Sequence, residues 1–63
     1  MDLSLAKEVD RALRLAGLEN APVAERLAFL GRAEAKALAM GDQGVLRALA
    51  VWRVRRQIIY QLT

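Results

Sequence analysis

The sequence contains no cysteine and no histidine, and these two absences exclude several kinds of chemistry. Disulfides, thiolate or imidazole metal ligands and nucleophile–histidine pairs all need one of the two residues. The hydroxyls of Ser4 and Thr63 lie near the chain ends, where ordering and burial are hardest, and the glycines match no phosphate-binding loop pattern. We therefore predict a protein that is not an enzyme and that binds no metal and no cofactor.

Long apolar runs are also missing, and the first residues do not have the pattern expected of a secretory signal. Before the C-terminal region, the longest stretch without a charged residue is five residues, as in 37–41, whereas roughly 20 apolar residues are needed to span a bilayer. Asp2 stands where a signal peptide carries Lys or Arg. We therefore expect no transmembrane helix and a cytoplasmic protein, and the lack of cysteine agrees with that compartment.

Proline and aromatic residues are few, and the chain of 63 residues is 56% hydrophobic and rich in alanine and leucine. This composition favours helix and argues against disorder or a β-sandwich. So short a chain forms one small domain over residues 1–63, and its apolar burial only roughly offsets the conformational entropy lost on folding. Without a disulfide or metal, association is the remaining source of stability, so we expect a homo-oligomer, most simply a dimer.

Three helices are expected, over residues 3–17, 22–40 and 43–61. Gly17 and Gly41 suit the left-handed position that ends a helix, and Asp42 suits the cap of the next one. The second helix is apolar over much of its circumference and needs more than one neighbour to cover it. The apolar face expected for the first helix contains Leu5, Val9, Ala12, Leu13 and Ala16, with Ala6 at its edge.

The C-terminal segment, 43–63, fits two periodicities. As a helix it gathers Trp52, Ile58 and Ile59 in one broad arc, whereas as a strand its apolar and polar residues alternate. A lone strand leaves its backbone hydrogen-bonding groups unpaired unless another chain supplies a neighbour. We favour an all-α chain, a helical hairpin plus an N-terminal helix packed as a homodimeric helical bundle, and keep an intermolecular strand as the alternative.

Several large apolar residues are candidates for self-association or partner binding. Trp52 is the single tryptophan and is expected to anchor a core or a subunit interface, with base stacking as the alternative. Phe29 and Met40 return to nearly the same helix face and lie away from the main leucine stripe. The candidates are Phe29, Leu38, Met40, Val51, Trp52, Ile58, Ile59 and Leu62.

Acidic residues are absent after Asp42, whereas residues 43–63 contain four arginines. These side chains either solvate a helix face and pair with acids elsewhere, or they contact nucleic-acid phosphates. The candidate nucleic-acid contacts, which share one arc of a helix, are Arg53, Arg56, Gln57 and Tyr60. The basic side chains are spread around the helix rather than confined to one face, so we expect no membrane binding.

Two charged residues, Glu34 and Arg55, fall inside apolar arcs. Charges of opposite sign are rarely buried unless they meet. We therefore predict a structural ion pair between Glu34 and Arg55, within one chain or between two.

Together these patterns predict a small helical interaction or assembly module that self-associates and binds a protein partner, with regulation as one form of that role. The alternative is a small dimeric nucleic-acid-binding regulator that uses the arginine-rich C-terminal segment. Salt distinguishes them, because phosphate contacts weaken steeply as salt rises and apolar contacts do not.

Overall fold

The computed structural model describes residues 3–62, apart from the side chain of Leu62. These residues form a short 3-10 helix, Leu3–Leu5, followed by α1 (Ala6–Leu15), α2 (Val23–Met40) and α3 (Gln43–Leu62), and they contain no strand. The predicted all-helical fold with three helices is confirmed. The segment with two possible periodicities is a helix in the single chain.

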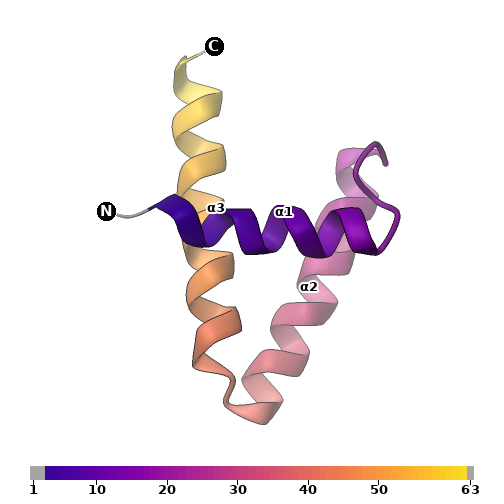
Figure 1. Cartoon of the computed structure of the whole chain (residues 1–63), viewed down its shortest axis with the longest axis vertical. Helices are drawn as coiled ribbons and strands as arrows, with labels where there is room; N and C mark the ends of the chain where they lie inside the picture. Colours follow the sequence, from indigo (N-terminus) through magenta and orange to yellow (C-terminus); the bar gives the residue numbers. More distant parts are fainter. Residues whose placement is uncertain (1–2, 63) are drawn as a thin grey trace.

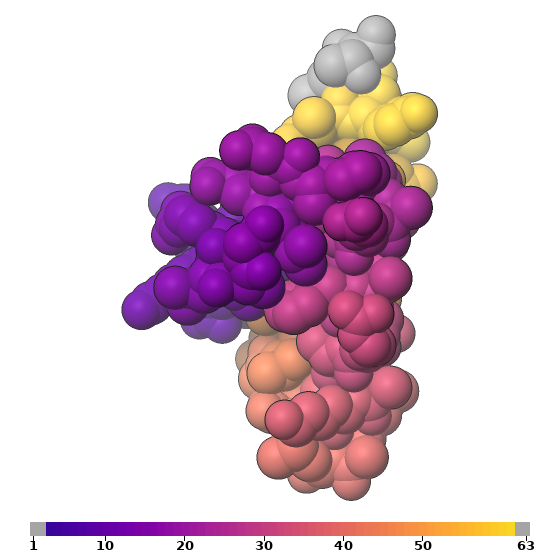
Figure 2. All heavy atoms as spheres, turned by 90° about the vertical axis from the view of Figure 1, so that its right-hand side faces the viewer, coloured from indigo at the N-terminus to yellow at the C-terminus, as the bar shows by residue number. Residues whose placement is uncertain are grey.

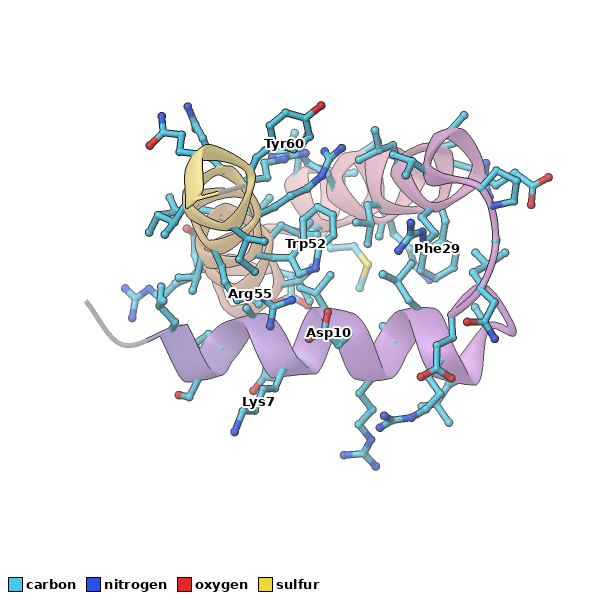
Figure 3. The ribbon with its side chains drawn as sticks, turned by 90° about the horizontal axis from the view of Figure 1, so that it is seen from above. Lys7, Asp10, Phe29, Trp52, Arg55 and Tyr60 are labelled. Carbon is cyan, nitrogen blue, oxygen red and sulfur yellow. The ribbon has the colours of Figure 1, made fainter. Side chains whose placement is uncertain are left out.

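The helices form two layers. Helices α2 and α3 make a hairpin that is closed at Gly41 and opens toward its other end, and α1 lies across both (Figure 1). Seen from above, α1 lies on one side and the hairpin on the other (Figure 3). Helix α3 is the central element, because α1, α2 and the 3-10 helix all pack against it. The resulting body is flat, with extents of 36 × 28 × 16 Å.

The chain reverses at two glycines that adopt left-handed backbone conformations. Gly17 has φ 75° and Gly41 has φ 68°, which a residue with a Cβ adopts only at a cost. After Gly41, the Asp42 N–H donates to the Ala37 carbonyl at 2.8 Å, the bond of a Schellman motif. The Asp42 side chain then accepts a bond from the Val45 N–H at 3.2 Å, so the predicted helix end and cap are both confirmed.

The core lies where α1 crosses the hairpin. Helix α1 contributes Ala6, Val9 and Leu13, α2 contributes Leu30, and α3 contributes Ala48, Leu49 and Trp52. The buried face of α1 is rotated relative to the predicted one, toward the edge at Ala6. Ala6 is fully buried, while Ala12 and Ala16 are exposed. Two members of this cluster, Ala6 of α1 and Ala48 of α3, have small side chains, and α1 and α3 pack against each other.

Much of the apolar surface of α2 is not covered by the other helices. Leu30 and Ala37 are its buried residues, whereas Val23, Leu27, Leu38 and Met40 are exposed. Helix α1 covers only part of the hairpin. Part of the apolar surface of α2 therefore has no packing neighbour among the described residues. No helix within residues 3–62 has the length and apolar character to cross a membrane.

Candidate functional site

A three-residue hydrogen-bonding network joins α1 to α3. The Arg55 guanidinium donates two bonds of 2.8 Å to the two carboxylate oxygens of Asp10, and the Trp52 indole N–H donates to the same carboxylate at 3.2 Å. Figure 3 shows Asp10 on α1 facing Trp52 and Arg55 on α3. The bonds from Arg55 lower the pKa of the Asp10 carboxyl below its usual value, with a smaller contribution from Trp52, although partial burial opposes the shift.

The predicted pair between Glu34 and Arg55 is not formed within the chain. Arg55 binds Asp10, and Glu34 binds Arg53 instead. The reason is the position of α1, which crosses α3 beside Arg55 and brings Asp10 to it, while Arg53 lies on the side of α3 near α2. Both residues are in ion pairs, but each has a different partner from the one predicted.

Beside this network, the open end of the hairpin forms a groove of about 260 Å³ between α2 and α3. The buried side chains of Leu13 and Trp52 line its base, and Trp52 is only 7% exposed. Apolar side chains line its walls: Val23 and Leu27 from α2, 46% and 40% exposed, and Ile59 from α3, 55% exposed. Apolar surface therefore faces solvent from both helices.

The charged residues that line the groove are mostly basic. Arg26, Arg55 and Arg56 line it together with a single carboxylate, Asp10, which is already bonded to Arg55. The Arg56 guanidinium lies 5.8 Å from the centre of the Trp52 ring, within the range of a cation–π contact. The Nε atom of Arg26 is buried without a hydrogen-bond partner. The groove therefore combines apolar walls with an excess of positive charge.

The four candidate nucleic-acid contacts lie together on α3. Arg53, Arg56, Gln57 and Tyr60 line a second, more open hollow with Gln61. Arg53 is bonded there to Glu34, and Arg56 lies over Trp52. The predicted arc is thus present, but its two guanidinium groups already have partners within the chain.

The candidate partner-binding residues are divided between core and surface. Trp52 is in the core, and Phe29 and Val51 are partly buried against it. Leu38, Met40, Ile58 and Ile59 are exposed, but the first two lie near the closed end of the hairpin and the isoleucines near its open end (Figure 1). The structure therefore does not bring them into one patch, and the side chain of Leu62 lies outside the described residues.

Sequence reasoning missed the α2 wall of the groove, which contains Val23, Arg26 and Leu27. Val23 and Leu27 have the i, i+4 spacing of a buried helix face, so their pattern resembles that of core residues. The signal that could have found this wall is the broad apolar arc of α2. It predicts a helix whose apolar surface the rest of the chain does not cover completely.

No known family model, curated protein or solved structure matches this chain, so the assignment of a function depends on the geometry and chemistry of the groove and of α3.

Proposed function

We propose that this chain is a small helical interaction module that works by binding and not by catalysis. It self-associates through one side of α3 and receives a helical segment of a partner protein in the groove between α2 and α3. One observation carries the proposal: the C-terminal turns of α3 extend past α1 and α2 (Figure 2) and expose apolar side chains on two sides.

The first apolar side of α3 consists of Val51, Val54 and Ile58. These residues have the spacing of a helix stripe, and Val54 and Ile58 are exposed, while Val51 is partly buried. None of the three lines the groove. A stripe at this spacing is suited to packing against the same stripe of a second copy, in the manner of a short coiled coil.

The second apolar side faces the groove and includes Ile59. The groove, with a volume of about 260 Å³, is open to solvent along one side, whereas small-molecule sites enclose most of the surface of their ligand. It is large enough to receive individual side chains from a helix that lies along its mouth, as in helix-in-groove recognition. Protein binding therefore fits this site better than binding of a metabolite.

Ile58→Glu is expected to dissociate the dimer. At a two-fold contact it places two carboxylates against apolar surface, which should raise the dimer Kd on the order of 100-fold. The measurement is solution mass by size exclusion with light scattering, over a micromolar concentration series at two salt concentrations. We expect the wild-type chain to be a dimer whose mass is insensitive to salt.

Leu38→Glu is the matched control, because Leu38 is more exposed than Ile58 and lies on α2. We expect it to remain a dimer. Dissociation by Leu38→Glu alone would assign the contact to the closed end of the hairpin. A wild-type chain that stays monomeric at every concentration would overturn self-association and leave the exposed apolar surface to a different protein.

A second candidate function is nucleic-acid binding, favoured by the hollow that Arg53, Arg56, Gln57 and Tyr60 share. A phosphate there competes with Glu34 for the Arg53 guanidinium, so we expect a labelled single-stranded oligonucleotide to bind weakly at low salt and to be released at about 150 mM salt. Fluorescence polarisation measures this. Tight binding at that salt, weakened by Arg53→Gln and Arg56→Gln but not by Arg32→Gln, would favour the nucleic-acid function instead.

A further inference from the structure

We infer that the partner of the groove is an amphipathic helix that carries carboxylates along the edges of its apolar stripe. The inference depends on the proposed function, since it names the chemistry of the segment that the groove receives. It follows from the arrangement of apolar and charged side chains around the groove.

The apolar residues of the groove set the first requirement. Val23 and Leu27 are one helical turn apart on α2, and Ile59 faces them from α3. A partner helix with apolar side chains at positions i, i+3 or i+4, and i+7 presents a stripe that matches this arrangement. The buried Trp52 and Leu13 at the base give the inserted side chains an apolar surface to contact.

The guanidinium groups set the second requirement, and they lie on both walls. Arg26 belongs to α2 and Arg56 to α3, and within the described residues neither is in an ion pair. The one carboxylate of the lining, on Asp10, already accepts bonds from Arg55 and Trp52. A helix lying between Arg26 and Arg56 therefore meets positive charge at both edges, and Glu or Asp at those edges forms charge-assisted hydrogen bonds.

A second copy of this chain is a poor occupant. Each copy has a net charge of +3, and its helix α3, which exposes apolar residues, contains four arginines and no acidic residue. Bringing a second basic surface onto Arg26 and Arg56 adds like-charge repulsion. Nucleic acid supplies the opposite charge, but its phosphates gain nothing from Val23, Leu27 and Ile59. Apolar walls with basic edges are complementary to an acidic amphipathic helix.

The test is a displayed library of helical peptides of about 18 residues, a length of five turns. Its apolar stripe is fixed and its flanking positions are randomised among acidic, basic and neutral polar residues. The library is selected on the full chain at about 150 mM salt. Single selected peptides are then measured by fluorescence polarisation against the wild-type chain and its variants, after circular dichroism has shown that each variant is as helical as the wild type.

The variants separate charge from apolar contact. Arg26→Gln with Arg56→Gln removes two guanidinium groups that are in no ion pair within the described residues, and Arg32→Gln with Arg47→Gln removes two exposed charges that do not line the groove. Leu27→Gln removes apolar contact from the groove wall without changing its charge, and Val23→Gln repeats that test at a second position. All these positions except Arg26 are exposed, so their substitution leaves the core intact.

We expect the selected peptides to be enriched in Glu and Asp at the flanking positions. The Arg26 and Arg56 double variant should weaken their binding at least about tenfold, as charge pairs across interfaces do. The matched arginine control should stay within about twofold of the wild type, as expected for charges remote from the interface. Leu27→Gln and Val23→Gln, which keep the charge of the groove, should each weaken binding at least about tenfold, because an inserted apolar side chain loses its contact.

Three outcomes would overturn part or all of the inferred partner chemistry. Peptides with basic or neutral flanks that bind equally well, yet are weakened by Leu27→Gln, overturn the acidic partner and leave the proposed function standing. Failure to select any peptide that Leu27→Gln and Val23→Gln weaken overturns the groove as a docking site, and the inference with it. Displacement of the peptides by a single-stranded oligonucleotide that depends on Arg26 and Arg56 assigns the basic groove to nucleic acid.

Discussion

Trp52→Ala is expected to unfold most of the chain at room temperature. Trp52 is buried among residues of all three helices and donates a hydrogen bond to Asp10. Removing a buried tryptophan typically costs about 3 to 5 kcal/mol, whereas the core of so small a domain rarely supplies more than about 5 kcal/mol. Far-ultraviolet circular dichroism should show that much of the helical signal is already lost at room temperature, before heating causes any unfolding transition.

Trp52→Phe separates packing from the hydrogen bond. Phenylalanine keeps an aromatic ring in the core but lacks the indole N–H, so the variant should fold and lose only about 1 to 2 kcal/mol of unfolding free energy. A Trp52→Ala variant whose melting temperature stayed near that of the wild type would show that the core does not depend on this side chain.

The positions of the helices could be predicted because the signals that end them are local. Gly17 and Gly41 adopt the left-handed conformation that a helix end needs, and Asp42 bonds to an N–H only three residues away. Such interactions can be predicted from neighbouring residues alone, without knowing how the helices pack. The helical state of residues 43–62 was harder to predict, because β-branched and aromatic residues fit either period.

The ion pairs could not be predicted, because they depend on how α1 crosses α3. The sequence places Asp10 on the polar side of the first helix, and only the crossing brings that side against Arg55. Spacing along one helix gives no information on this contact between residues 45 positions apart. Glu34 was recognised as a charge within an apolar arc, but its partner Arg53 depends on the register between α2 and α3.

The candidate site could be predicted only in part, because it also depends on how the helices pack. Ile59 and Arg56 were selected from the pattern of α3, and both line the groove. The opposite wall, with Val23 and Leu27, resembles any buried helix face until the hairpin is seen to open at that end. Exposure of an apolar residue is a property of the assembled fold, so a periodic pattern alone does not reveal it.

Asp10→Asn is expected to destabilise the fold and to remove much of its sensitivity to acid. The bonds from Arg55 hold the pKa of Asp10 below its usual value of 3.8, so the unfolded chain binds a proton more readily than the folded one. The stabilisation is therefore complete above the usual pKa and is lost as the pH falls through the lower, folded value. Because the pair is partly exposed, the substitution should cost only about 1 to 2 kcal/mol at neutral pH.

Urea denaturation at a series of pH values measures this, with Glu34→Gln as the matched control. Arg53 likewise holds the pKa of Glu34 below its usual value, but the Arg53 side chain is more exposed to solvent than that of Arg55, so loss of this pair should change stability little. Arg55→Gln should reproduce the flatter acid profile of Asp10→Asn, and the double variant should add little to either single change. Additive losses would mean that the two residues act separately, and that packing around Trp52, not this ion pair, fixes α1 across α3.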